Sequence, residues 1–141
     1  MADKSGFHTQ KGYELIGTSK ITTSMEDYLE MISRMLLKNE YARVNELAKN
    51  LNVKPSSASK MTAKLWKQDF IKFEHYGYIK LTEKGTKYGD YLLYRHDVLN
   101  QFLRYVNNSI DELQQVERIE HFFDRHTVEN IDLMLNKFKS K

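Results

Sequence analysis

The fold is decided by residues 44–69, which read VNELAKNLNVKPSSASKMTAKLWKQD. Apolar residues recur there at helical spacing in two runs, the first made of Val44, Leu47, Ala48 and Leu51 and the second of Ala58, Met61 and Leu65. Between the runs, Asn52 and Val53 interrupt the pattern, and Pro55 suits the first turn of a new helix. The stretch therefore predicts two helices joined by a tight turn.

The outer face of the second helix carries small hydroxyl and lysine side chains: Ser56, Ser57, Ser59, Lys60 and Lys64. Small residues let a helix backbone approach closely, and serine and lysine still offer hydrogen-bond donors. This combination suits the major groove of DNA, although an ordinary soluble helix surface has a similar pattern.

The charge distribution favours DNA. Residues 42–87 carry 10 basic and 4 acidic side chains, a net charge of +6, whereas residues 1–41 carry 5 and 6, and residues 88–141 carry 7 and 9. Concentrating basic charge in one part of a chain is expected when that part faces a polyanion.

Residues 71–81 predict a short β-hairpin, because Ile71, Phe73, Ile79 and Leu81 alternate with polar residues around Gly77. Two helices followed by a hairpin form the winged helix-turn-helix arrangement. The side chains predicted to contact DNA are Arg43, Lys54, Ser56, Ser57, Lys60 and Lys64 on the helical part, and Lys72, His75, Tyr76 and Lys80 on the wing.

Further helical patterns flank this unit. Before it, Ser24 is a predicted N-cap, with Asp27 three residues on, for a helix whose apolar stripe is Leu29, Ile32, Met35 and Leu36. After it, Thr82 is expected to cap a long helix in which Gly85 approaches the sheet. A helix capped by Ser109 and a last helix over about residues 127–138 complete the pattern.

Composition excludes several classes of protein. A chain of 141 residues fits one domain or two small ones. The absence of cysteine excludes disulfides, thiolate metal sites and cysteine nucleophiles. No apolar run reaches membrane-spanning length and the N-terminus lacks the apolar core of a signal peptide, so we expect a cytoplasmic protein without a membrane partner.

A second informative stretch is Glu-Arg-Ile-Glu-His at residues 117–121. On a helix, Glu117, Glu120 and His121 share one face, so two carboxylates and an imidazole could converge on a cation. A solvated acidic face with a chance histidine gives the same pattern. A site is the better interpretation once Asp27 and Glu30, at i and i+3 near the start of the first helix, and His96 in the long helix are added.

Five motifs, in this order, resemble the diphtheria-toxin-repressor family of metal-dependent bacterial repressors: Ser24-Met25-Glu26-Asp27-Tyr28-Leu29-Glu30, Tyr41-Ala42-Arg43-Val44, Pro55-Ser56-Ser57, Tyr94-Arg95-His96 and Glu117-x-x-Glu120-His121. The likeness covers about residues 22–141 and is to the manganese-responsive branch. It implies the metal ligands Asp27, Glu30, His96, Glu117, Glu120 and His121. The iron-responsive branch has methionine and cysteine in place of Asp27 and Glu117, and usually an SH3-like domain that we do not expect here.

The resemblance implies a homodimeric, Mn(II)-activated repressor of manganese-uptake genes that binds double-stranded operator DNA and has no small-molecule substrate. Four carboxylates and two imidazoles without sulfur suit Mn(II), with Fe(II), Co(II), Cd(II) or Zn(II) as substitutes. We expect two ions per subunit. They would tie the two halves of the chain together and set two recognition helices to successive major grooves, about 34–36 Å apart. Without metal, repulsion among the carboxylates should leave the halves loosely oriented.

We therefore expect a mainly α fold in three parts. These are a flexible N-terminal arm over residues 1–21, a winged helix-turn-helix domain with a small β-hairpin wing over residues 22–87, and an α-helical metal-binding and dimerisation domain over residues 88–141.

Other functions remain open at this stage. A carboxylate-bridged dimetal enzyme would have the same acidic residues, but the Glu-x-x-His element of di-iron helices and the His-Glu-x-x-His motif are missing. A winged-helix regulator could instead respond to iron, or to an organic ligand without any metal. Loss of DNA binding on chelation would separate a metal-activated regulator from one that ignores metal.

Overall fold

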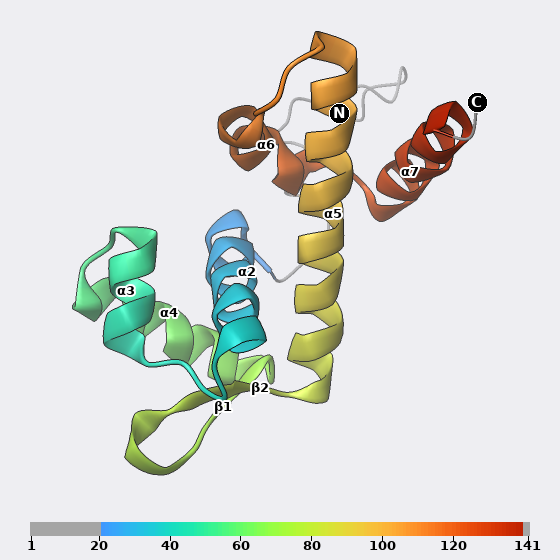
Figure 1. The fold of residues 1–141 in the computed structure, drawn as a ribbon. Coiled ribbons are helices and arrows are strands. Elements are labelled where there is room, and N and C mark those ends of the chain that lie inside the picture. Colours follow the sequence, from blue (N-terminus) through green and yellow to red (C-terminus); the bar gives the residue numbers. More distant parts are fainter. Residues whose placement is uncertain (1–20, 140–141) are drawn as a thin grey trace, which may run out of the picture.

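The computed structural model describes residues 21–139, which form six α-helices and a two-stranded sheet (Figure 1). In chain order the elements are α2 (Thr23–Lys38), α3 (Val44–Leu51), α4 (Pro55–Lys67), β1 (Ile71–Phe73), the 3-10 turn η1 (His75–Gly77), β2 (Ile79–Leu81), α5 (Glu83–Asn107), α6 (Leu113–Ile119), the 3-10 turn η2 (Glu120–Phe122) and α7 (Arg125–Lys139). The predicted arm lies outside the described residues apart from Ile21. Within residues 21–139, no helix has the length and apolar character needed to cross a membrane.

The predicted winged helix-turn-helix is confirmed. Helix α3 stops at Asn52, whose left-handed backbone (φ 56°) lets its N–H bond back to the carbonyl of Ala48, and α4 begins at Pro55. Strands β1 and β2 pair antiparallel, with Ile71 opposite Leu81. Ala42 adds an isolated bridge to Ile79, which joins the loop before α3 to the hairpin.

Helix α5 runs past both halves of the molecule (Figure 1). Thr82 caps it as predicted, since its Oγ1 accepts from the N–H of Gly85 at 3.0 Å. Gly85 is required by packing, because a Cβ there would lie 1.8 Å from the carbonyl oxygen of Phe70. The first half of α5 packs on α2 and the hairpin and the second half on α6 and α7, so the expected boundary between residues 87 and 88 lies inside this helix.

The apolar core has two parts that meet along α5. The first part joins α2, α3, α4, the hairpin and the start of α5, and its fully buried side chains include Leu29, Ile32, Leu47, Leu65, Ile79 and Leu92. The second part lies between the end of α5, α6 and α7, and contains Val98, Leu99, Leu103, Val116, Val128 and Leu135. Each set recurs at helical spacing in the sequence, which explains why the helices were predictable.

Two predicted helix starts are wrong, and a third lies within two residues of the predicted position. Helix α2 is capped by Thr22, whose Oγ1 accepts from the N–H of Met25 at 3.1 Å, so Ser24 lies inside the first turn. The hydroxyl of Ser109 donates to the Glu112 carboxylate at 2.6 Å, and the helix expected after Ser109 begins only at Leu113. Helix α7 starts at Arg125, two residues before the predicted position.

The contact at Gly85 gives a stability prediction. Replacing Gly85 with alanine forces α5 away from the backbone of Phe70, so we expect the free energy of unfolding to fall by about 1–3 kcal/mol in urea titrations. Thr86→Ala gives alanine at the next position, on the exposed side of α5, and adds no atom, so it should change stability by less than about 0.5 kcal/mol. Equal urea midpoints for Gly85→Ala and the parent would show that this contact is not tight.

Candidate metal centre and DNA-facing surface

Four of the predicted ligands form a compact cluster: Glu30 of α2, His96 of α5, Glu117 of α6 and Glu120 of η2. One ligand atom from each lies within 4.8 Å of all the others. Nδ1 of His96 is 3.0 Å from Glu120, 3.5 Å from Glu117 and 3.8 Å from Glu30. Glu120, Glu30 and His96 are buried, whereas half of the Glu117 side chain is exposed. The cluster is therefore buried except at Glu117, which is exposed to solvent.

The other two predicted ligands, Asp27 and His121, lie beside this cluster and contact each other. Nε2 of His121 is 2.8 Å from Oδ1 of Asp27. The argument that His121 shares a helix face with Glu117 is wrong, because α6 ends at Ile119 and the tighter turn η2 points His121 toward α2. All six side chains thus lie where α2, α5, α6 and η2 meet, and their role as metal ligands stays a prediction.

Two charged residues at this junction were missed: Glu26 and Arg95. Arg95 is 2% exposed, and its Nη2 lies 3.3 Å from Oε1 of Glu26 and 3.8 Å from Oε1 of Glu120. The carboxylates are therefore not left to repel one another without a counter-charge. Helical spacing could have found Arg95, because it lies three residues after Leu92 and four before Leu99, on the buried face of α5.

Protonation differs between the two deepest carboxylates of the cluster. Burial raises the pKa of Glu30 to about 8, and both the hydrogen bond that Glu30 donates to Glu120 and the negative charge of Glu120 act in the same direction. Burial acts on Glu120 in the same direction, but hydrogen bonds with His96 and Glu30 outweigh it and hold the pKa of Glu120 below its usual value. In the metal-free protein Glu30 thus retains a proton at neutral pH and Glu120 is the charged partner.

At His121, hydrogen bonding outweighs burial and favours the protonated imidazole. Burial lowers the pKa of the imidazole, but hydrogen bonds to Asp27 and Glu26 outweigh it and raise the pKa to about 10. Burial likewise raises the pKa of Glu26, and hydrogen bonds from His121 and Tyr88 with the charge of Arg95 bring it below its usual value. The metal-free junction is held by protonated His121 and by Arg95.

The donor set fits a divalent cation. Oε1 of Glu120 is buried and has no hydrogen-bond partner, which is the kind of acceptor that a cation satisfies. The six side chains offer carboxylate oxygens and imidazole nitrogens only, and hard oxygen donors favour ions such as Mn(II) or Mg(II) over thiophilic ones. Chemically, a bound ion could replace the protons of Glu30 and His121 as the positive charge that offsets the carboxylates.

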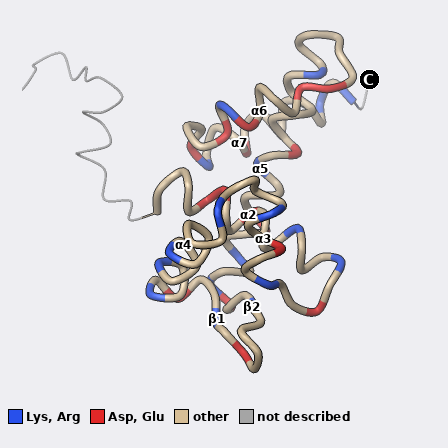
Figure 2. The backbone as a smooth tube through the Cα atoms, turned by 90° about the vertical axis from the view of Figure 1, so that its left-hand side faces the viewer, with Lys and Arg blue, Asp and Glu red and all other residues tan. Residues whose placement is uncertain are grey.

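The surface of α3, α4 and the hairpin is basic, and Figure 2 shows Lys and Arg positions along α4. Helix α4 buries Ala58, Thr62 and Leu65 and leaves Ser56, Ser57, Ser59, Lys60 and Lys64 exposed. Of the ten side chains predicted to contact DNA, nine are exposed and Lys80 is partly exposed. Access is therefore available to all of them, and contact with DNA stays a prediction.

Two local interactions shape the wing side of this surface. Lys72 and Lys80 both lie near the carboxylate of Glu74, at 3.9 and 3.6 Å, which holds the two lysines together. The guanidinium of Arg43 donates to the hydroxyl of Tyr78 at 2.6 Å, and the Tyr78 ring stacks on Tyr41 with a centroid distance of 3.8 Å. Arg43 is thereby fixed beside the start of α3.

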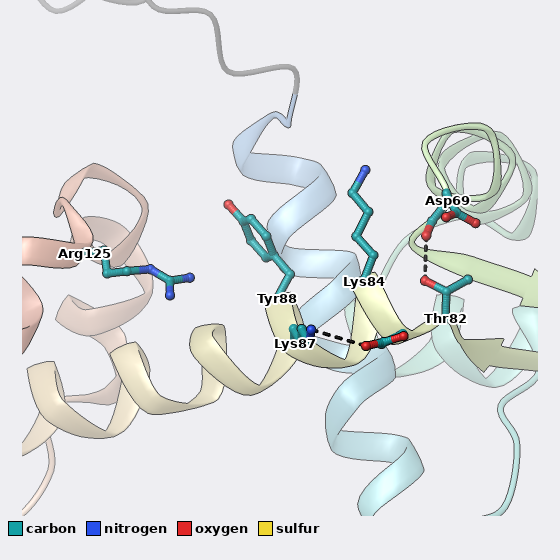
Figure 3. Close-up of a pocket in the computed structure, with 7 residues that line it drawn as sticks. Asp69, Thr82, Lys84, Lys87, Tyr88 and Arg125 are labelled. Atoms are coloured by element: carbon teal, nitrogen blue, oxygen red, sulfur yellow. Dashed lines mark hydrogen bonds and ion pairs between the residues drawn. The ribbon is translucent and has the colours of Figure 1, made fainter.

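A cavity of about 590 Å³ opens at the start of α5, and none of the six predicted ligands lines it (Figure 3). Its charges are mixed and already partnered: Lys87 pairs with Glu83 at 3.2 Å, and Lys84 donates to the carbonyl oxygen of Gln68 at 2.8 Å. Arg125 lies over the Tyr91 ring at 4.0 Å. This cavity therefore shows no preference for one class of ligand.

Comparison with known proteins adds two family matches. The family model described as "Iron dependent repressor, N-terminal DNA binding domain" matches residues 20–79, and "Iron dependent repressor, metal binding and dimerisation domain" matches residues 82–141. The chain is 40% identical over 119 residues to the HTH-type transcriptional regulator MntR of Geobacillus kaustophilus, covering 84% of each chain. The MntR of Bacillus subtilis matches with the same identity and coverage.

Among solved structures, the manganese regulator SloR matches with a TM-score of 0.72 and 26% identity. The match covers 82% of this chain and 55% of that structure, so the chain spans about half the length of SloR.

The proton on Glu30 gives a prediction for the metal-free protein. Because the folded protein holds this proton more tightly than an unfolded chain, the free energy of unfolding should fall as pH rises from the ordinary value of 4.5 to about 8. Glu30→Gln removes that dependence. In urea titrations with chelator, the free energy of unfolding of the variant, relative to that of the parent, should rise by roughly 2 kcal/mol between pH 5 and pH 9. This value allows for the loss of the ion pair between Glu30 and Arg34.

The matched control is Glu40→Gln, because Glu40 is an exposed carboxylate after the end of α2 and is not a member of the cluster. It should follow the parent at every pH. A parent protein whose stability is the same at pH 5 and pH 9, or a Glu30→Gln protein with the parent's pH dependence, would contradict a buried proton at this position.

Proposed function

The chain belongs to the iron-dependent repressor family of metal-dependent DNA-binding transcription regulators, and we propose that Mn(II) is the ion that activates it. The observation that carries this proposal is the sulfur-free cluster of Glu30, His96, Glu117 and Glu120, with Asp27 and His121 beside it. Hard oxygen donors suit Mn(II), whereas sulfur donors would favour softer ions. The likeness to MntR proteins and to the manganese regulator SloR supports the same choice. The family comprises regulators, and the chain is not an enzyme.

We propose two ions per subunit. The four-residue cluster would hold one ion, and Asp27 with His121 forms a second group of donors next to it. Glu117 is a candidate to be shared, because its charge is close enough to Asp27 for the two carboxylates to influence each other. Fe(II), Co(II), Cd(II) and Zn(II) are expected substitutes, because a site of nitrogen and oxygen donors binds many divalent metals. The affinities follow a general order among the metals, so selectivity for Mn(II) has to come from the geometry of the site.

Activation is proposed to act through helix α2. A bound divalent ion supplies positive charge that lets the carboxylates of the cluster remain ionised together. Asp27 and Glu30 lie on α2, which packs on α3 and α4, whereas His96, Glu117, Glu120 and His121 lie on α5, α6 and η2. Drawing these groups together fixes the DNA-binding half, proposed as residues 22–87, against the helical half, proposed as residues 88–141.

The chain binds operator DNA as a homodimer, in keeping with its DNA-binding and dimerisation domains. We propose that α4 enters the major groove, with Ser57 and Lys60 near base edges and Lys64 near phosphate, and that Arg43, Lys54, Ser56 and the wing residues Lys72, His75, Tyr76 and Lys80 hold the backbone. Repression of manganese-uptake genes in the cytoplasm is the proposed outcome, because binding would then occur when the ion is plentiful.

The proposal is tested by DNA binding with and without metal. Duplexes selected from sheared genomic DNA by the Mn(II)-loaded protein serve as probes in fluorescence anisotropy. Chelation should weaken binding by about 5- to 150-fold, the usual range for coupled sites. Glu120→Gln should bind weakly at every Mn(II) concentration, while Glu129→Gln, an exposed charge change on α7, should match the parent. Equal affinity in Mn(II) and in chelator would refute metal activation.

The DNA-binding surface gives a second prediction. Lys64→Ala removes one phosphate contact, so binding to operator and random DNA should weaken together and the salt dependence should fall by about one charge. Ser57→Ala should instead change sequence preference. Arg118→Ala, which removes an exposed charge from α6, should leave both unchanged. The same loss on operator and random DNA for Ser57→Ala would place base recognition elsewhere.

A further inference from the structure

The carboxylate of Glu26 is buried beside the candidate metal centre and is not among the predicted ligands. It lies on α2 next to Asp27 and faces α5 and η2. Its three neighbours come from two elements: His121 from η2, and Tyr88 and Arg95 from α5. A buried carboxylate with so many partners needs an explanation, because burial of charge is costly unless every lone pair is used.

Every acceptor position of Glu26 is occupied. Oε1 accepts from Nδ1 of His121 at 2.8 Å and from Nη2 of Arg95 at 3.3 Å, and Oε2 accepts from the hydroxyl of Tyr88 at 2.6 Å and from Nη1 of Arg95 at 3.5 Å. A carboxylate offers about four lone-pair positions. Glu26 therefore has no free position for a metal ion, and its contribution must act through His121.

The two ring nitrogens of His121 have different partners. Nδ1 faces Glu26, and Nε2 faces the predicted ligand Asp27 at 2.8 Å. Nη2 of Arg95 also lies 3.3 Å from Nδ1. A hydrogen bond between these two nitrogens can form only if Nδ1 carries no proton, because the arginine nitrogen can only donate. Because an arginine can only donate, its approach to Nδ1 competes with the Nδ1–H to Glu26 bond, and the shorter contact to the carboxylate favours a proton on Nδ1.

We propose that Glu26 is a positioning residue that keeps the proton on Nδ1 of His121 and so presents Nε2, next to Asp27, to the metal ion. Carboxylates that accept from the outer nitrogen of a metal-binding histidine set the orientation of the ring and raise its strength as a ligand. Tyr88 and Arg95 hold Glu26 in turn, so α5 controls a ligand on η2 through a residue of α2. Tyr88 rises from α5 beside α2 (Figure 3).

The inference rests on the proposed function, since it requires His121 to bind the ion. The test is a double-mutant cycle on Mn(II) affinity, measured without DNA from the free Mn(II) signal in electron paramagnetic resonance. Glu26→Gln keeps the shape and removes the charge, and should weaken Mn(II) binding by about 10- to 100-fold. In a His121→Ala background, the same change should have almost no further effect, because the ligand through which Glu26 acts is gone.

Two further variants separate positioning from a general loss of structure. Asp97→Asn removes one negative charge from the exposed side of α5, next to His96, and should leave Mn(II) affinity within about twofold of the parent. Tyr88→Phe removes a single hydrogen bond to Glu26 and should weaken affinity by about 2- to 10-fold. This milder change keeps the test usable if Glu26→Gln does not fold.

A direct readout of the ring comes from nitrogen-15 NMR of His121 in the Cd(II)-loaded protein, where the ion is diamagnetic. The parent should show a protonated Nδ1 and a metal-bound Nε2, and in Glu26→Gln the Nδ1 proton should exchange faster with water. A loss of affinity in Glu26→Gln that is as large with His121→Ala as without it would overturn the inference. Failure of the parent to bind Mn(II) would instead refute the proposed function.

Discussion

The structure depends on one buried guanidinium, that of Arg95, between the carboxylates of Glu26 and Glu120. Arg95 is 2% exposed, and both carboxylates belong to elements that meet only in the folded protein. A charge in this position would be strongly destabilising without partners, so α2, α5 and η2 must come together for any of them to be buried. Removal of one partner is therefore expected to affect the whole junction more than a surface ion pair would.

This junction links the two halves of the molecule. Helix α2 contributes its apolar face to the core of the winged helix-turn-helix and its acidic face, with Glu26, Asp27 and Glu30, to the candidate metal centre. Its close approach to α5 is permitted by Gly89, where a Cβ would lie 2.0 Å from the hydroxyl oxygen of Ser33. A change of charge at the centre would therefore act on the same helix that supports α3 and α4, which is the route that we propose from metal to DNA.

The carboxylates of the candidate metal centre are offset by protons and positive charges of the protein itself. A proton on Glu30, a second proton on His121 and the guanidinium of Arg95 offset the carboxylates. An activating ion would displace these protons when it binds, so its affinity is expected to increase with pH. The expectation of two loosely oriented halves considered only the carboxylates and not these internal positive charges, and it stays a prediction.

The sequence by itself determined the helices, the hairpin and the basic surface, because each follows from a local rule of spacing, capping or charge that needs no distant partner. It also identified the family through motifs such as Tyr94-Arg95-His96. Only the tertiary structure decided that α6 ends at Ile119, that His121 turns toward Asp27, and that Glu26 and Arg95 belong to the centre. The physical reason is that burial of a charge depends on partners from other elements, up to 95 residues away in the chain for Glu26 and His121, and no local pattern records them.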